Sequence, residues 1–339
     1  MSILMLEGGP QTRTQIDDPS QVGECRRSAQ RLAEAHGFDA TQVGRVGIVA
    51  TELANNVANH ARRGEFLLQA LGEGSGVSIE MVAIDRGPGM HVDTCMRDGH
   101  STAGTAGTGL GAVSRLSSMF DVYSLIDQGT VAVSRISKPA AIRSGPASAF
   151  GAICIAVAGE IECGDTWRIA QRDDALAILV CDGLGHGSPA SLASQAAAQT
   201  FKENPFERPS EAMQRFHTKL AGGRGAAAAV AVLDRAKANV AYAGIGNVAG
   251  SIVSSERSKG MVSHNGILGV QVVRSQQFDY EFPQGSRIIM HSDGMSARWS
   301  LSSYPGLSFH HASVIAAVLY RDHARPRDDV TVIVAGGST

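Results

Sequence analysis

The sequence has 339 residues, of which 43% are hydrophobic, 18% are charged and 39 are glycine. This composition is typical of a globular protein with many tight turns, and the length predicts about two domains. The formal net charge is −2, neither half of the chain is strongly polarised, and aromatic residues make up 5%. A nucleic-acid-binding surface would need a basic stripe or a platform of stacking aromatics, so we exclude nucleic acid as a partner.

The five cysteines include no C-x-x-C pair, and their odd number argues against a disulfide framework or a zinc site. At the N-terminus, Glu7 interrupts the short apolar stretch from Ile3 to Leu6, so no signal-peptide core is expected. No window reaches the roughly 18 uninterrupted apolar residues that a membrane-spanning helix needs. We therefore expect a cytoplasmic protein without a membrane anchor.

The predicted elements of the first part begin with two helices. Apolar residues recur at helical spacing from Val22 to Leu32 and again from Val43 to Val57. The elements that follow are strands over 66–70 and 77–84, a glycine-rich loop over 87–111, a helix over 112–118, and strands over 120–125 and 130–136. This order predicts an α/β sandwich as a first domain of residues 1–138.

Residues 139–148 combine prolines, a glycine and small polar residues, as an interdomain linker does. Beyond them a second domain is predicted over 149–339, with helices over 189–204 and 210–221. Its apolar strands are expected at 149–157, 175–181, 226–233, 239–245, 287–291 and 330–335. We expect two packed sheets flanked by helices in this domain. The predicted fold class of the chain is therefore α/β (α+β), with an α/β sandwich first and a β-sandwich flanked by helices second.

Three groups of residues in the first domain could form a nucleotide site. Glu52, Asn56 and His60 are spaced i, i+4, i+8 and so share one helical face, although such a row alone is more often a solvated polar face. Asp85 ends a predicted strand before a glycine turn, where its carboxylate can accept a hydrogen bond from an amino-purine. The glycine run of residues 107–111 opens a helix and presents backbone N–H groups to a phosphate.

The ordered set E-x-x-x-N, D-x-G-x-G and G-x-G-x-G resembles the nucleotide-binding boxes of the GHKL ATPase superfamily, over most of residues 10–137. The phrases ELANNVANHA and DRGPGM are similar to those of anti-sigma-factor serine kinases of the RsbT and RsbW type. The resemblance implies that Asn56 holds the Mg²⁺ on ATP, Glu52 orients or deprotonates the attacking serine, and Asp85 recognises adenine. The pocket and lid would be shaped by Gly87, Gly89, Gly107, Thr108, Gly109, Leu110 and Gly111.

Four acidic motifs stand beside apolar strands of the second domain, at Asp165, at Asp182-Gly183, at Asp293-Gly294 and at Asp328-Asp329. One Asp-Gly after a strand is usually only a turn, but four such sites in one domain need another explanation. Carboxylates that converge from several strand ends form an all-oxygen site, which suits Mg²⁺ or Mn²⁺. Two such ions can activate a water and clamp a phosphate.

These motifs, with the segments 224–227 and 244–247, resemble the SpoIIE-type branch of the PPM metal-dependent phosphatases over about residues 150–336. The resemblance implies that Asp182 bridges two Mn²⁺ or Mg²⁺ ions and that the Gly183 carbonyl binds one of them. Asp293 and Asp328 would bind the other ion, and Asp165 would act directly or through water. The adjacent Asp329 stays an alternative to Asp328, which the offset to Thr331 favours, and no arginine clamp for phosphate is evident.

The resemblances imply a bifunctional partner-switching regulator that uses ATP with Mg²⁺. Its first domain would phosphorylate a serine of a STAS-domain anti-sigma-factor antagonist, with Glu52 as a catalytic residue. Its second domain would dephosphorylate that serine, with Asp182 and Asp293 as catalytic ligands. The alternative is a first domain that binds ATP and a partner, such as a sigma factor, without transferring phosphate, and gates the phosphatase. The sequence leaves open whether the chain forms a homodimer.

Overall fold

The computed structural model describes residues 3–61, 63–72, 74–95, 109–138, 150–254, 257–271 and 275–336. These residues form two compact units. The N-terminal unit contains Gln11–Pro146 and Phe309–Val318, and the C-terminal unit contains Met1–Pro10, Ala147–Ser308 and Leu319–Thr339. The linker expected at 139–148 lies outside the described residues. Each unit therefore takes up a short segment that is distant from the rest of it in the sequence.

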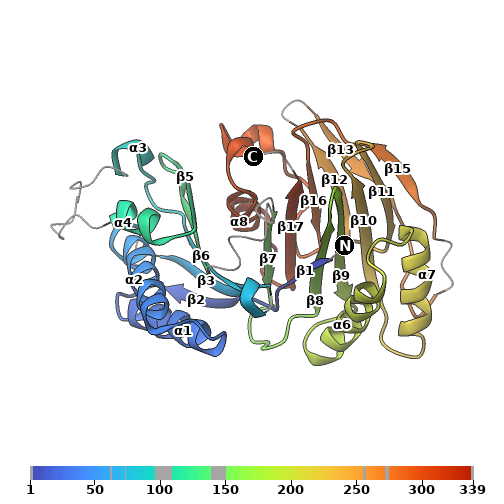
Figure 1. The fold of residues 1–339 in the computed structure, drawn as a ribbon, viewed down its shortest axis with the longest axis horizontal. Coiled ribbons are helices and arrows are strands. Elements are labelled where there is room, and N and C mark those ends of the chain that lie inside the picture. Colours follow the sequence, from blue (N-terminus) through green and yellow to red (C-terminus); the bar gives the residue numbers. More distant parts are fainter. Residues whose placement is uncertain are drawn as a thin grey trace. The chain divides into compact units, whose positions relative to one another are not determined.

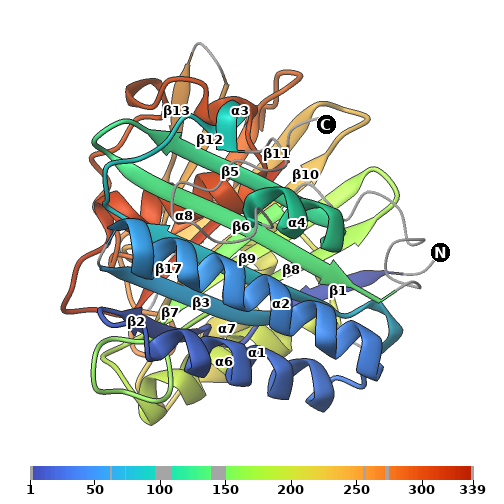
Figure 2. The same cartoon turned by 90° about the vertical axis from the view of Figure 1, so that its left-hand side faces the viewer.

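The N-terminal unit is built on one antiparallel five-stranded sheet. Its strands, in spatial order, are β2 (Thr12–Ile16), β3 (Gly64–Leu71), β4 (Ser78–Asp85), β6 (Gly129–Ser137) and β5 (Met119–Leu125). Helices α1 (Gln21–Ala35), α2 (Ala40–Asn56) and α4 (Gly109–Leu116) lie along this sheet in Figure 2, and short α3 (Val92–Cys95) and 3₁₀-helix η2 (Gly74–Gly76) complete the unit. The α/β sandwich predicted for this part is confirmed, although β2 was not among the predicted strands.

Helix α2 carries the row of polar residues that the sequence singled out. A capping box starts the helix, because the Asp39 side chain accepts from the Gln42 backbone N–H and the Gln42 side chain accepts from that of Asp39. Its apolar face, which includes Ala50 and Leu53, is buried in the core against the sheet. At Val57 the α-helix gives way to a single π-helical turn, η1 (Val57–Ala61).

Residues 309–318 are fixed to the sheet of the N-terminal unit by polar contacts. The fully buried Glu80 accepts a hydrogen bond from Arg135 Nε at 2.6 Å and one from Ser313 Oγ at 2.8 Å. Asp121 accepts from the backbone N–H of His311 at 2.7 Å and contacts His310 Nδ1 at 2.9 Å. Ser313 belongs to helix α8 (Ala312–His323), a third helix of the second half that the sequence analysis omitted.

The C-terminal unit contains two sheets. The first is ordered β1 (Leu4–Glu7), β8 (Asp165–Arg172), β9 (Ala175–Gly183), β10 (Ala226–Asp234), β11 (Asn239–Ile245) and β14 (Ser263–His264), with β15 (Phe278–Glu281) also paired to β11. The second is ordered β13 (Ser258–Met261), β12 (Ala249–Val253), β16 (Arg287–His291), β17 (Val330–Gly336) and β7 (Phe150–Ile155). Contacts between β8 and β17 join the two sheets.

Helices α6 (Ser188–Glu203) and α7 (Pro209–Leu220) pack on the first sheet through an apolar cluster that includes Phe201 and Phe216 (Figure 1). The remaining elements are the 3₁₀-helices η3 (Leu301–Ser303) and η4 (Leu307–Phe309). The predicted helix-flanked β-sandwich is confirmed. Among the helices of the described residues, none is long and apolar enough to cross a membrane.

Candidate functional sites

The centre of the C-terminal site is a pair of opposed carboxylates. Asp165 opens β8 and Asp182 lies near the end of β9, and the two residues are direct partners in the antiparallel register. Burial raises the pKa of Asp165 to about 7. A hydrogen bond with the Ser292 side chain acts to lower this pKa, and the charges of Asp329 and Asp293 act to raise it. Burial raises the pKa of Asp182 to about 9, and the charge of Asp165 adds to it. This environment therefore disfavours the ionised form of both carboxylates.

Asp293 and Asp328 belong to the same cluster. They flank the neighbouring antiparallel strands β16 and β17, Asp293 just after one and Asp328 just before the other. Both carboxylates raise the pKa of Asp182, and burial followed by the charge of Asp293 raises the pKa of Asp328. The structure thus places the four carboxylates that the sequence predicted as ligands at neighbouring strand ends of both sheets, where their charges influence one another.

Asp329 has a different surrounding from Asp328. Its side chain is 2% exposed, and its two oxygens accept hydrogen bonds from the backbone N–H groups of Val157 at 2.7 Å and Gly164 at 2.8 Å. Asp328 is half-buried, and its Oδ1 accepts from the backbone N–H of Asp329 at 3.0 Å. Asp329 therefore ties two loops to the site, while Asp328 retains more capacity to bind a cation.

Gly183 lies where the chain leaves β9 and meets the start of α6. A Cβ on this residue would lie 2.0 Å from the carbonyl oxygen of Ala190, so no larger residue fits without moving that helix. The Gly183 backbone N–H donates to the carbonyl of Gly164 at 3.1 Å. This close packing sets the position of the loop that follows Asp182.

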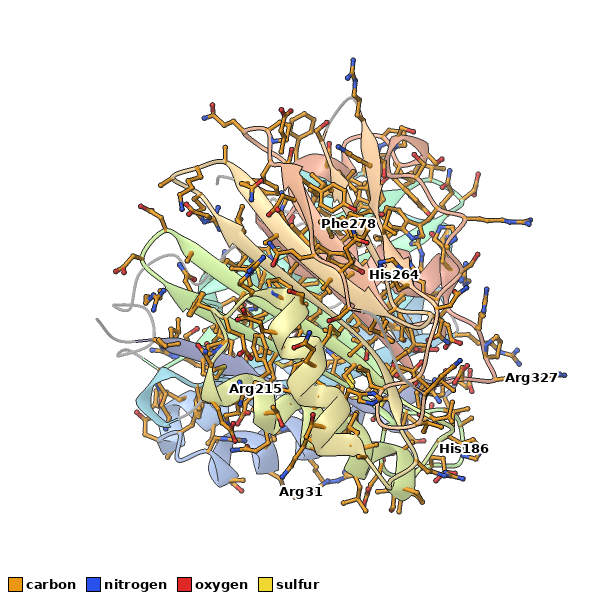
Figure 3. The ribbon with its side chains drawn as sticks, turned by 90° about the vertical axis from the view of Figure 1, so that its right-hand side faces the viewer. Arg31, His186, Arg215, His264, Phe278 and Arg327 are labelled. Atoms are coloured by element: carbon orange, nitrogen blue, oxygen red, sulfur yellow. The ribbon has the colours of Figure 1, made fainter. Side chains whose placement is uncertain are left out.

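The sequence analysis gave no role to Asn247, whose Nδ2 donates to Asp293 Oδ2 at 2.5 Å. Asn247 lies two residues beyond the end of β11. A polar residue just after a glycine at a strand end is the sequence signal that could have identified it. On the loop after Asp182, His186 Nδ1 contacts Glu160 Oε1 at 2.7 Å. Arg327, beside Asp328 in the chain, extends away from the ribbon in Figure 3, so it forms no phosphate clamp in this position.

The donor set fits hard divalent cations such as Mg²⁺ or Mn²⁺. All of the clustered side chains offer oxygen, and Asp165 Oδ2 is buried without a hydrogen-bond partner among the described residues. Within that same part of the chain no three acidic, histidine or cysteine side chains lie close enough together to hold a metal ion. The fit therefore rests on the donor chemistry and on the uncompensated charge, which a cation would neutralise.

In the N-terminal unit, Glu52 and Asn56 lie half-buried on the last turns of α2. The Asn56 Nδ2 is buried and makes no hydrogen bond within the described residues, so it can still donate one to a ligand. His60 is exposed on η1, where the π-helical turn breaks the 3.6-residue period. The expected alignment of His60 with Glu52 and Asn56 assumed a continuous α-helix, and it stays a prediction.

Asp85 ends β4 at a tightly packed turn. Its Oδ1 accepts from the backbone N–H of Gly87 at 2.8 Å and of Thr130 at 3.1 Å. Gly89 has a φ of 69°, and a Cβ there would lie 2.1 Å from the carbonyl oxygen of Leu125. The turn is thus held against the β5–β6 hairpin, which fixes the direction of the Asp85 carboxylate.

Thr130 is a residue that the sequence analysis missed at this site. Its Oγ1 lies 3.0 Å from Ser124 Oγ, and Ser124 Oγ accepts from the backbone N–H of Met90 at 2.9 Å. The only signal in the sequence was a Gly-Thr pair at the start of a predicted strand. Of the glycine-run residues, Gly109, Leu110 and Gly111 form the first turn of α4, whereas Gly107 and Thr108 lie outside the described residues.

Two family models match the chain one after the other. Residues 17–135 match the histidine kinase-like ATPase domain, and residues 172–336 match stage II sporulation protein E (SpoIIE). The first match contains Glu52, Asn56 and Asp85, and the second contains Asp182 and the carboxylates of β16 and β17. Asp165 lies just before the second match.

Known proteins resemble the two parts separately. Serine/threonine-protein kinase RsbT of Bacillus subtilis (strain 168) is 30% identical over 107 residues, which are 31% of this chain and 80% of RsbT. Phosphoserine phosphatase RsbX of the same organism is 27% identical over 139 residues, which are 41% of this chain and 70% of RsbX. A solved structure reported as "The bacterial stressosome: a modular system that has been adapted to control secondary messenger signaling" has 28% identity and a TM-score of 0.52, and covers 55% of this chain and 98% of that one. The chain therefore belongs to the RsbT-like family through its histidine kinase-like ATPase domain, and it continues into a PPM phosphatase domain of the SpoIIE family.

Proposed function

We propose that this chain is a bifunctional partner-switching enzyme that adds a phosphoryl group to a serine of a STAS-domain antagonist protein and also removes it. The phosphatase assignment depends above all on the four carboxylates at neighbouring strand ends, where burial and then the charge of Asp165 raise the pKa of Asp182. Such a cluster destabilises the folded chain when its charges are not neutralised. Bound divalent cations would neutralise these charges and form a site that can activate water. RsbX is named a phosphoserine phosphatase and RsbT a serine/threonine kinase, and this chain resembles both.

In the phosphatase reaction, Asp182 and the Gly183 carbonyl would hold two Mg²⁺ or Mn²⁺ ions together with Asp165, Asp293 and Asp328. When bound, the ions supply a water of lowered pKa and neutralise charge on the phosphate. Asn247 keeps Asp293 oriented through its hydrogen bond to Oδ2. Water gains the phosphoryl group as inorganic phosphate, and the serine oxygen leaves with a proton.

In the kinase reaction, the fixed Asp85 carboxylate would accept a hydrogen bond from the amino group of adenine. The half-buried Asn56 side chain would hold the Mg²⁺ that accompanies the phosphates through its amide oxygen, and Glu52 on the same helix would take the proton of the attacking serine. The γ-phosphoryl group passes from ATP to the serine oxygen, and ADP leaves. Because this chemistry needs mainly positioning, the rigid turn at Asp85 is a suitable support.

The decisive experiment uses the full-length chain with a candidate STAS protein, ATP and Mg²⁺. We compare wild type, Glu52→Ala and Asp182→Asn, with Asp174→Asn in the exposed β8–β9 turn as the matched control. Phosphorylated STAS protein should accumulate most with Asp182→Asn, little with wild type and the control, and not at all with Glu52→Ala. Equal accumulation with wild type and Asp182→Asn, in a chain that hydrolyses other phosphate esters, would contradict action on one shared serine.

A second candidate function is that ATP binding gates the phosphatase without phosphoryl transfer. It is favoured by helix α8, whose first residues belong to the N-terminal unit and whose last residues belong to the C-terminal unit. Asp328 follows the end of this helix by five residues. The test measures hydrolysis of para-nitrophenyl phosphate by Glu52→Ala with and without ATP; a change in rate supports gating, and an unchanged rate contradicts it.

A further inference from the structure

Two cysteine side chains of the C-terminal unit lie in contact beside the carboxylate cluster. Cys154 is on β7, Cys163 lies near the end of the loop 156–164 that leads into β8 (Figure 1), and their Sγ atoms are 3.7 Å apart. The two residues are 1% and 2% exposed. Cys154 Sγ also lies 3.8 Å from the backbone carbonyl oxygen of Asp165. The proposed reactions do not use these thiols, although both lie close to a proposed cation ligand.

The two sulfur atoms are close enough for a disulfide to form with a small movement. An S–S bond is about 2.05 Å long, so its formation from this contact requires the sulfurs to approach by roughly 1.7 Å. Cys154 is held within β7, where its partner in the antiparallel register is Thr331 of β17. Cys163 lies outside the strands, two residues before Asp165 opens β8. The movement therefore falls mainly on Cys163 and on the residues that follow it.

The loop before Cys163 gives a small oxidant access to this thiol. Residues 158, 159, 161 and 162 of the loop are exposed. Glu160 contacts His186 Nδ1 at 2.7 Å, and the His186 side chain is 64% exposed. An exposed contact of this kind stabilises a loop only weakly, so the loop can open locally while the sheets stay folded. Such opening exposes Cys163 first, because the β7–β17 ladder holds Cys154 in place.

Gly164, between Cys163 and Asp165, is packed too closely to absorb such a movement. Its backbone N–H donates to Asp329 Oδ2 at 2.8 Å, and its carbonyl accepts from the backbone N–H of Gly183 at 3.1 Å. A Cβ on Gly164 would lie 2.7 Å from Asp329 Oδ2, so there is no space on that side. A shift of Cys163 therefore pulls on these two hydrogen bonds and displaces the Asp165 carboxylate.

We propose that Cys154 and Cys163 form a reversible disulfide that switches off the phosphatase site when the protein meets a peroxide. The inference rests on the proposed phosphatase function and adds a form of regulation to it. Hydrogen peroxide oxidises the Cys163 thiol to a sulfenic acid and releases one water, and the Cys154 thiol then displaces the sulfenic oxygen as a second water. The two thiols lose two electrons and two protons in total, and the oxygen–oxygen bond of the peroxide breaks. A dithiol reductant restores both thiols by exchange.

Peptide mapping tests whether the bond forms. Full-length protein is reduced, freed of reductant, treated with hydrogen peroxide, quenched with catalase, alkylated with iodoacetamide and digested for mass spectrometry. We expect a linked pair of peptides that contains Cys154 and Cys163, with a mass lower by two hydrogen atoms than the sum of the reduced peptides. The other cysteines, Cys25, Cys95 and Cys181, should stay outside this link. Oxidised protein that contains no such pair would refute the proposal.

Turnover of para-nitrophenyl phosphate and Mn²⁺ affinity test the effect on the site. Peroxide should lower the turnover of wild type with Mn²⁺ about tenfold or more, and dithiothreitol should restore it. Isothermal titration calorimetry should show a similar loss of Mn²⁺ affinity in the oxidised protein, because Asp165 is displaced. Cys154→Ala and Cys163→Ala should keep their turnover after peroxide, since neither can form the bond. Linked protein that keeps its turnover and its Mn²⁺ affinity would contradict the regulatory role.

Cys95→Ala is the matched control, because Cys95 is a partly exposed cysteine of the N-terminal unit. It should lose and regain turnover as wild type does. Equal inactivation of Cys163→Ala and wild type would assign the effect to another oxidised group and overturn the proposal. Where an alanine variant has no turnover even when reduced, the peptide map of wild type and its recovery with dithiothreitol decide. Reduced wild type that hydrolyses neither a phosphoserine peptide nor para-nitrophenyl phosphate would instead exclude the phosphatase function, while the peptide map still tests the disulfide.

Discussion

Asp165 and Asp182 are direct partners across the antiparallel strands β8 and β9, so two carboxylates occupy opposed positions in the sheet. Like charges directly opposite one another destabilise a strand pair, and burial increases that cost. Burial first, and then the charge of Asp165, raise the pKa of Asp182 to about 9. Under the proposed function, the pair would serve as cation ligands.

This relationship predicts how stability depends on pH when cations are removed. The folded pKa values of Asp165 and Asp182, about 7 and about 9, lie above the ordinary value near 3.9 of an unfolded chain. Protonation then stabilises the fold fully below about pH 4, and this contribution is lost as the pH rises through 7 to 9. In EDTA the melting temperature of the C-terminal unit should fall from pH 5 to pH 9, as calorimetry can measure.

Saturating Mn²⁺ at pH 8 should reverse that loss, by about 2.7 kcal/mol at a hundredfold excess over the dissociation constant. In EDTA at pH 8, Asp182→Asn should be more stable than wild type, because the folded variant no longer has to take up a proton at this buried carboxyl. The variant should in turn lose most of the Mn²⁺ effect. A melting temperature at pH 8 that is the same with EDTA and with Mn²⁺ would contradict the cation site.

Asp328 and Asp329 should differ in what their removal costs. Asp328→Ala should lower phosphatase turnover more than about a hundredfold and leave the unfolding free energy of the EDTA-treated chain unchanged or raised. Asp329→Ala should lower that free energy by about 2–5 kcal/mol, because it leaves the buried N–H groups of Val157 and Gly164 without acceptors. Denaturant titration and turnover of para-nitrophenyl phosphate separate the two; the reverse pattern would make Asp329 the ligand.

Asp85 and Glu52 should act at different stages of the kinase reaction. Asp85→Asn should weaken ATP binding about tenfold or more, since an amide presents a donor where adenine needs an acceptor. Glu52→Ala should leave ATP affinity nearly unchanged and abolish transfer, because a base for the serine contributes mainly in the transition state. Isothermal titration calorimetry with Mg²⁺-ATP on the full chain measures both affinities. Loss of ATP affinity in Glu52→Ala alone would show the roles to be reversed.

The buried contact of Ser313 with Glu80 predicts that residues 309–318 stabilise the N-terminal unit. Ser313→Ala removes one hydrogen bond to the buried Glu80 carboxylate and one from Arg135 Nη2, and it should cost about 1.5–3 kcal/mol of unfolding free energy. Glu80→Ala should cost about 3–5 kcal/mol, because the Arg135 guanidinium loses a buried charged partner. Ser303→Ala, at an exposed position, is the control. Urea titration followed by a probe in the N-terminal unit gives the three values, and a Ser313→Ala curve that matches the control would contradict the role of this segment.

Local sequence determined much of this protein. The helix expected over 43–57 is α2, the strand over 77–84 is β4, and the helices over 189–204 and 210–221 are α6 and α7, each within a few residues. Their periodicity and caps act over neighbouring residues, so the sequence reports them directly. The acidic motifs at strand ends were visible for the same reason, because a turn residue after an apolar strand is a local pattern.

Only the tertiary structure decided which distant segments pair. Strand β1 joins β8, residues 309–318 join the N-terminal unit, and Asn247 reaches Asp293, although each of these contacts joins residues far apart in the chain. Asp329, adjacent to a proposed ligand, proved to hold two loops by their backbone N–H groups. No local propensity encodes such partners, because their free energy comes from hydrogen bonds and burial that exist only after the chain has folded.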